Sequence, residues 1–288
     1  MRRTLWLLGA LACQSTASST DTAEAFDQCA NEGPTQYLLV RQATFARGDA
    51  ITLVSEGFDL DNTVTGAGDV TGCGVEDYTS SDGTPGIDNS VARLLPILET
   101  TEAAAIEPII QDSINGGALL LMFGLHGLDS DQDDACVQVE VLQGVGDPFV
   151  GADGWIVPGQ TFDRDGANPI QMTETVPLVD GVVQAGPLEA AMAFQVLDAY
   201  IAFTMHSSMV KLWPNEDGTW SGRVAGGVDI DAMVAVATEQ NVDPAVFELI
   251  DPVLKLVADM GPDETGTCTQ LSMTLDFEAV PAFLFDEP

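Results

Sequence analysis

The sequence predicts an α+β fold, in which a mainly antiparallel β-sheet or sandwich carries two short helical pairs packed on it. Segments in which apolar and polar residues alternate outnumber segments with an apolar stripe at helical spacing. The connections are mostly short, and the 288 residues include 28 Gly and 15 Pro, which favour turns. Because the helical stripes fall in two separate places, we expect one sheet-based unit with two helical insertions.

The first residues have the features of an export signal. Arg2 and Arg3 precede an apolar stretch, Leu5–Ala12, which is too short to span a bilayer. We therefore expect residues 1–12 to be a signal peptide and the mature protein to lie outside the cytoplasm.

This signal ends in GALAC, which resembles the lipobox of bacterial lipoproteins. The resemblance implies that Cys13 receives a diacylglyceryl group and attaches the protein to a membrane, as a lipoprotein of the outer membrane or cell surface. Ala10 stands where the motif prefers Leu, and the tripeptide ALA also fits ordinary signal peptidase, so a secreted or periplasmic protein is the alternative. Residues 13–32 predict a Ser/Thr/Asp-rich tether, and residues 33–288 predict a single α+β domain.

The chain is strongly acidic, with 9 basic and 45 acidic residues and a formal net charge of −36. Such a surface repels nucleic-acid phosphates and anionic lipid headgroups, so we expect no nucleic-acid partner. It attracts cations. The simpler explanation of the acidic excess is a solvated surface that keeps the protein soluble, and specific cation binding is the alternative.

Five cysteines agree with an oxidising compartment. If Cys13 is lipidated or removed, an even set remains, which predicts two disulfides. The absence of C-x-x-C spacing and a total of only 2 His argue against zinc. We favour a bond between Cys29 and Cys73, which lie in loop-like stretches, and one between Cys136 and Cys268, which begin strand patterns.

Strand patterns occur along most of the chain. They carry β-branched and aromatic residues in period two, and turn residues separate them. Residues 58–89, in contrast, have almost nothing to bury and predict a long surface loop that Cys73 holds in place. The expected strands are 35–54 in two pieces, 118–125, 136–142, most of 159–228, and 269–285.

Helical patterns occur in two places. Asp88 or Asn89 is the expected N-cap of the first helix, and Asp231 is the expected cap of a later one. Two Asp-Pro pairs begin further helices, because proline lacks the N–H that a helix start leaves unbonded. The expected helices are 91–100, 102–114, 232–240, 245–250 and 253–260.

The acidic stretch GLDSDQDDACVQVEV, residues 127–141, connects an apolar strand to an alternating one, and we expect the two to form an antiparallel hairpin. Its acids fall at positions 1, 3, 5 and 12 of a calcium-binding loop. Position 6, normally Gly, is Asp, and the flanks predict strands, so a charged hairpin tip is the alternative that we favour. The candidate calcium ligands are Asp129, Asp131, Asp133, Asp134 and Glu140.

A second group of acids lies in the long loop. Asp59, Asp61 and Asn62 fall in GFDLDN, and Asp77, Asp82 and Asp88 follow. A long loop without a core of its own must be held by something, so these side chains are candidates to converge, although a disulfide alone would be enough.

No catalytic motif accompanies these residues. The sequence lacks G-x-S-x-G, a Walker loop, H-E-x-x-H and G-x-G-x-x-G, and we expect His126 and His206 to be structural. We therefore expect a noncatalytic domain that presents a surface or binds a protein or glycan partner, with calcium as a structural ion. Trp155, Trp213 and Trp220 leave a carbohydrate-binding or carbohydrate-active protein as the alternative.

Four segments resemble stretches of uncharacterised acidic lipoproteins from Gram-negative bacteria with large genomes: SSDGTPGIDNSVARLLP, DGVVQAGPLEAAM, DGTWSGRVAGGVDI and CTQLSMTLDFEAVPA. The resemblance covers most of the domain. It implies an extracytoplasmic lipoprotein and assigns no activity and no binding residues.

Overall fold

The computed structural model describes residues 33–285 except 71, 101–105, 169, 197–198 and 240–250. The predicted signal peptide and tether, with Cys13 and Cys29, lie outside the described residues, as does the predicted helix 245–250. In the part of the chain that is described, no helix is long and apolar enough to cross a membrane.

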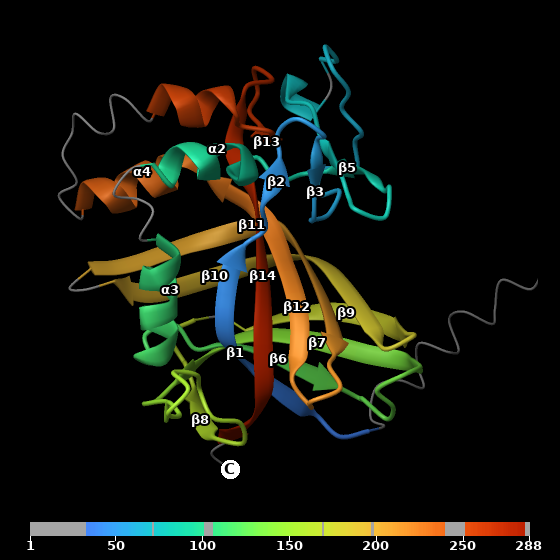
Figure 1. Cartoon of the computed structure of the whole chain (residues 1–288), viewed down its shortest axis with the longest axis vertical. Coiled ribbons are helices and arrows are strands. Elements are labelled where there is room, and N and C mark those ends of the chain that lie inside the picture. The colour runs from blue at the N-terminus through green and yellow to red at the C-terminus, as the bar shows by residue number, and fades with distance from the viewer. Residues whose placement is uncertain are drawn as a thin grey trace, which may run out of the picture.

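Eight strands form a closed antiparallel barrel (Figure 1). Each strand pairs with the next around the ring, and the 18-residue strand at the C-terminal end closes it by pairing with both its neighbours. The predicted antiparallel α+β class is confirmed, but the sheet is neither open nor a sandwich. In ring order the strands are β1 (Gln36–Phe45), β6 (Leu121–His126), β7 (Asp134–Val145), β9 (Gln171–Val179), β10 (Val182–Val196), β11 (Ala199–Pro214), β12 (Trp220–Asp229) and β14 (Cys268–Phe285).

Alternation along the strands fills the barrel with apolar side chains. The rings of Phe123 and Phe277 stack with their centroids 5.0 Å apart, and a Cβ atom on Gly222 would lie 2.2 Å from Phe277 Cζ, so this strand needs glycine there. The residues of this core that are at most 1% exposed include Leu38, Val40, Phe123, Leu125, Val137, Val139, Val210 and Leu212.

The hairpin expected from residues 118–142 is present. β6 and β7 pair antiparallel from Leu121 opposite Gln143 to His126 opposite Gln138, and the acidic stretch connects them. The short strand β8 (Thr161–Arg164) then bridges the far ends of two barrel strands, because it runs antiparallel to β7 and parallel to β14.

A layer of loops, short strands and helices covers one end of the barrel (Figure 1). Its helices pack through a second apolar core that includes Phe45, Leu95, Ile230, Leu254 and Leu271. The helix α3 (Ile106–Asn115) lies beside β1 instead. The other elements of the layer are β2 (Gly48–Asp49), β3 (Val54–Ser55), η2 (Gly72–Gly74), β4 (Tyr78–Thr79), β5 (Pro85–Ile87), α2 (Val91–Leu98), α4 (Ile230–Glu239), helical residues 251–256 and β13 (Met260–Pro262).

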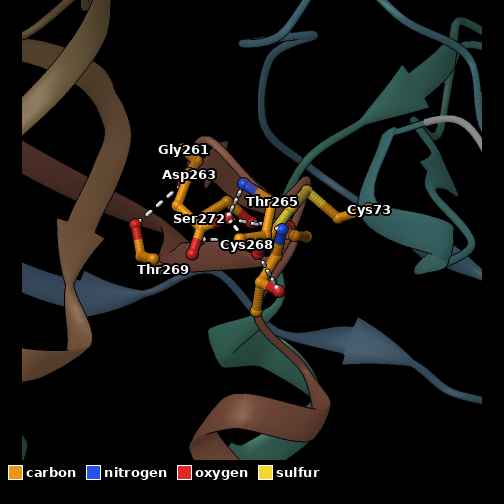
Figure 2. Close-up of a disulfide and its surroundings, with 9 residues drawn as sticks. Cys73, Gly261, Asp263, Thr265, Cys268, Thr269 and Ser272 are labelled. Carbon is orange, nitrogen blue, oxygen red and sulfur yellow. Dashed lines mark hydrogen bonds between the residues drawn. A yellow bond between two sulfur atoms is a disulfide. The ribbon is translucent and has the colours of Figure 1, made fainter.

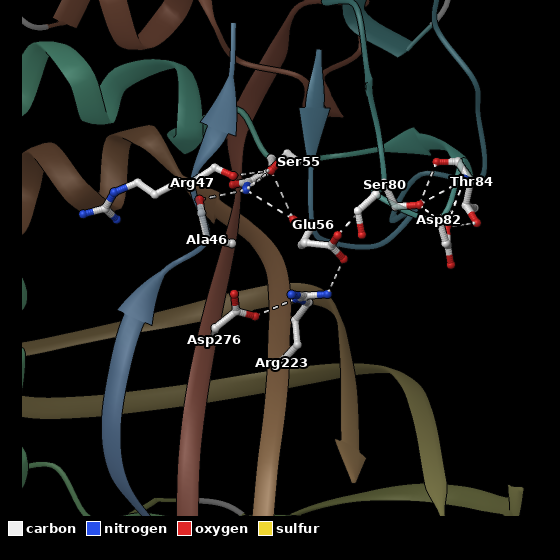
Figure 3. A network of polar contacts seen from close by, with 11 residues as sticks. Ala46, Arg47, Ser55, Glu56, Ser80, Asp82, Thr84, Arg223 and Asp276 are labelled. Atoms are coloured by element: carbon white, nitrogen blue, oxygen red, sulfur yellow. Dashed lines mark hydrogen bonds and ion pairs between the residues drawn. The ribbon is translucent and has the colours of Figure 1, made fainter. Parts of the chain in front are cut away.

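Arg223 ties this layer to the barrel (Figure 3). Its Nη1 lies 2.8 Å from Glu56 Oε2 in the layer, and its Nε donates to Asp276 Oδ1 of β14 at 2.6 Å. The side-chain amide of Asn89 adds a second link, since it donates to the Ala46 carbonyl and to Ser55 Oγ. The 58–89 segment is therefore held against the barrel rather than extended as a free loop.

Two local predictions were wrong. The N-cap of α2 is Ser90, because Asp88 and Asn89 use their side chains on other parts of the layer. The last helix stops at residue 256, because Met260 already belongs to β13, which pairs with the start of β14.

Candidate metal centre

Three aspartates of the loop layer converge. Each of Asp59, Asp61 and Asp88 offers one carboxylate oxygen, and these oxygens lie within 4.8 Å of one another. An isolated bridge between Phe58 and Asp88 brings the two parts of the loop side by side. Gly86 makes room, because it has a positive φ of 81° and a Cβ atom there would lie 3.3 Å from Asp59 Oδ2.

The backbone wraps around these carboxylates. Asp88 Oδ2 accepts hydrogen bonds from the amides of Leu60, at 2.6 Å, and Asp61, at 3.3 Å. The amide of Thr63 lies 2.8 Å from Asp61 Oδ1 and 3.1 Å from Asp59 Oδ1. Because the loop amides point inward, they position the acidic side chains before any ligand arrives.

Two further carboxylates stand beside the three. Asp77 Oδ2 accepts from the Thr65 amide at 2.6 Å. Asp259, which is 4% exposed, accepts from the Ser272 amide at 2.8 Å and from the Ser272 hydroxyl. These five side chains, Asp59, Asp61, Asp77, Asp88 and Asp259, are called the aspartate cluster below.

Burial favours the protonated form of four members of this cluster, and repulsion between neighbouring carboxylates adds to this effect at Asp61, Asp77 and Asp88. Burial, followed by the charges of neighbouring aspartates, raises the pKa of Asp88 from 3.8 to about 8 and that of Asp77 to about 6. Burial likewise raises the pKa of Asp61 and of Asp259. No basic side chain is among the main groups that set these four pKa values, so the charge must be neutralised by protons or by a bound cation.

A cavity of about 570 Å³ opens beside the cluster. Asp61 and Asp259 reach its wall, together with Asp69 and the apolar side chains of Val70 and Met260. The cavity gives a solute from solvent a route to two members of the cluster.

Figure 2 shows the disulfide Cys73–Cys268, and both of its cysteines line the cavity. It joins η2 to the first residue of β14, across a sequence separation of 195 residues. Next to it, the turn between β13 and β14 folds around Asp263, whose Oδ1 accepts from the Thr265 and Thr267 amides. The disulfide therefore fixes the long loop to a structured turn at the end of the barrel.

This bond corrects the pairing expected from the sequence, in which Cys73 joined Cys29 and Cys268 joined Cys136. Cys136 is also disulfide-bonded, and Cys29 lies outside the described residues. The expectation rested on the local pattern around each cysteine. It was wrong because the start of β14 pairs with β13 at the end of the barrel that carries the long loop.

The five residues of the predicted calcium loop do not form one group. Among the described residues, the aspartate triad above is the one set of three acidic, His or Cys ligands found close together. Asp134 caps the tip of the hairpin, since its carboxylate accepts from the Asp129 amide at 2.7 Å and from the Cys136 amide at 2.9 Å. Asp133 Oδ1 accepts from the Asp180 amide, and Asp131 and Gln132 lie against Gly181 at the next turn.

Glu140 is the buried member of a separate chain of polar contacts. It is 2% exposed, and one carboxylate oxygen lies 2.8 Å from His126 Nε2 while the other is bonded by Arg164. Thr35 Oγ1 lies 3.0 Å from His126 Nδ1, on the other side of the ring. Because none of these residues lines the cavity, we interpret the chain as the neutralisation of a buried carboxylate. Nothing in the sequence indicated this burial, because Glu140 takes a polar position in the alternation of CVQVEV.

The three tryptophans do not gather at the cavity. Trp220 is 3% exposed within the barrel core, and Trp155 and Trp213 are half-buried. None of them lines the cavity beside the acidic residues.

Comparison with known proteins found no family model, no curated protein and no solved structure that matches this chain.

Proposed function

We propose that the protein is a noncatalytic, lipid-anchored domain of the bacterial cell envelope, which binds a calcium ion at Asp59, Asp61 and Asp88. The calcium ion would hold the loop layer in shape, and the domain would present this layer to a protein or glycan partner outside the cytoplasm. The observation that carries the calcium site is the convergence of three carboxylates, from exposed Asp59, half-buried Asp61 and buried Asp88, with no basic side chain among the main groups that raise the pKa of Asp61 and Asp88. The export signal, with its resemblance to a lipobox, supports the location.

Calcium suits this ligand set. It prefers hard oxygen ligands at about 2.3–2.6 Å, so two ligands on opposite sides of one ion stand about 5 Å apart. The 4.8 Å limit on the oxygens of the triad is compatible with that spacing. Three carboxylates are also the usual charge for a divalent cation that completes its shell with backbone carbonyls and water.

Thermal unfolding tests the site. Free calcium at about 100 times Kd is expected to stabilise the protein by about 2.7 kcal/mol over the chelated protein. That corresponds to a rise of about 5–11 °C in Tm for a domain of this size. An unchanged midpoint would reject the calcium site.

Two variants locate the ion. Asp61→Asn should abolish the calcium-dependent rise in Tm, because it removes a ligand of the triad. Asp131→Asn is the matched control in the hairpin tip and should leave the rise unchanged. Loss of the rise in Asp131→Asn with retention in Asp61→Asn would move the site to the hairpin.

Mass spectrometry of the protein purified from membranes tests the location. A peptide that begins at Cys13 and carries a diacylglyceryl group is expected. A mature chain that retains residues 1–12, or one that lacks lipid and is found in the medium, would contradict the lipid anchor.

A further inference from the structure

His206 joins three strands of the barrel. It lies on β11, and its Nδ1 is 2.5 Å from Glu189 Oε2 on β10, while its Nε2 is 3.0 Å from Asp229 Oδ2 at the end of β12. From the sequence we expected this histidine to be structural, and the proposed calcium site does not include it.

The two contacts fix the protonation of the ring. An ionised carboxylate can only accept hydrogen bonds, so both ring nitrogens must donate, and only the doubly protonated imidazolium has two N–H groups. We propose that His206 is an acid-dependent clasp, in which the imidazolium holds β10, β11 and β12 together and its deprotonation loosens this part of the barrel.

The clasp lies where the strand pairing is irregular. The register between β10 and β11 shifts on both sides of Leu188, and the register between β11 and β12 shifts between His206 and Met209. Ser207, between them, has a positive φ of 52°, and its amide donates to Glu189 Oε1 at 3.3 Å. Side-chain contacts therefore link the strands where the backbone ladder is interrupted.

The charged groups around the ring set the direction of the effect. Burial lowers the pKa of His206, but its hydrogen bonds and charge interactions with Glu189 and Asp229 outweigh burial, and the pKa is raised. On α4, which packs on β11 and β12, Asp231 carries a negative charge that interacts with Lys255, whereas the charged groups that raise the pKa of His206 are Glu189 and Asp229. Because the folded-state pKa lies above 6.5, the stabilisation is complete below about pH 6.5 and is lost as the pH rises through the folded-state pKa.

Nuclear magnetic resonance of the ring nitrogens tests the protonation directly. In the chelated wild-type protein at about pH 6, both His206 nitrogens should carry protons, and the midpoint of titration should lie above the value of about 6.5 for free histidine. Glu189→Gln should lower that midpoint. One unprotonated nitrogen at this pH, or a midpoint at or below that of free histidine, would overturn the proposal.

Hydrogen exchange tests the consequence. After correction for intrinsic rates, exchange in peptides from 182–190 and 204–210 should increase between about pH 6 and pH 8 in the wild-type protein. In His206→Gln it should be fast at both pH values, since the Gln amide carries no positive charge and has both of its N–H groups on one nitrogen, so it does not replace donors on two separate ring nitrogens. The aspartate cluster is intact in His206→Gln, so a difference in hydrogen exchange between this variant and the wild-type protein reports on the clasp alone. The calcium-dependent rise in Tm should be the same in both proteins. The same pH dependence in His206→Gln as in the wild-type protein would overturn the proposal.

Discussion

Replacing Asp88 by Asn should change the pH dependence of stability in the chelated protein. Asp88 is 2% exposed, and its pKa is raised from 3.8 to about 8. The unfolded chain therefore releases this proton near its ordinary pKa while the folded protein keeps it, so stability falls as the pH rises between about 4 and 8. At 1.36 kcal/mol for each pH unit, the loss from this group reaches about 4 kcal/mol at pH 7.

The amide variant removes this titration but adds an N–H₂ group that needs hydrogen-bond acceptors. The side-chain oxygen of Asn can still accept the hydrogen bond that the Leu60 amide donates. A buried N–H donor without an acceptor costs about 1–3 kcal/mol of stability. From this group the loss at pH 8 is about 5 kcal/mol, so Asp88→Asn should be more stable than the chelated wild-type protein at pH 8 by about 2–4 kcal/mol. It should be less stable near about pH 3, where the wild-type carboxyl is protonated in both states.

Urea unfolding followed by tryptophan fluorescence, at several pH values in chelator, measures this difference. Asp82→Asn is the control, because Asp82 lies in an exposed turn of the same loop and burial does not hold a proton on it. Parallel pH profiles of wild type and Asp88→Asn would refute the reasoning, since they would mean that Asp88 ionises in the folded state as it does in the unfolded chain.

Three other changes should lower the free energy of unfolding in separate parts of the structure. Cys268→Ser opens a loop of 195 residues and should cost about 5 kcal/mol in urea unfolding, if the disulfide acts by restricting the unfolded chain. Arg164→Met leaves the charge of Glu140 buried without its arginine partner and should lower the free energy of unfolding by about 3–5 kcal/mol. Adding Glu140→Gln to this variant should partly restore the lost stability. Phe277→Ala empties part of the barrel core and should cost about 3–5 kcal/mol, whereas Phe285→Ala, at a side chain 55% exposed, should cost less than about 0.5 kcal/mol. Equal losses in the two phenylalanine variants would contradict the assignment of the core.

Local patterns in the sequence determined which segments form strands. Alternation in CVQVEV and in the last 17 residues before the C-terminal acids was sufficient to predict β7 and β14, because a strand with one buried face must place apolar residues at every second position. The hairpin followed from a continuous apolar strand and an alternating strand joined by a short acidic connection. The same information could not distinguish an open sheet from a barrel, because the side-chain period is two in both, and closure depends on which distant strand pairs with β14.

The sequence alone determined the candidate metal site only in part. The sequence indicated that Asp59, Asp61 and Asp88 belong to a loop that something must hold, but it favoured the hairpin acids as the calcium ligands. No periodicity connects residues 59 and 88, and Asp259 comes from a different end of the chain, so only the folded backbone could bring them together. The disulfide partner of Cys73 and the strands joined by His206 were decided in the same way, since long-range pairing depends on the three-dimensional course of the chain and leaves no local trace in it.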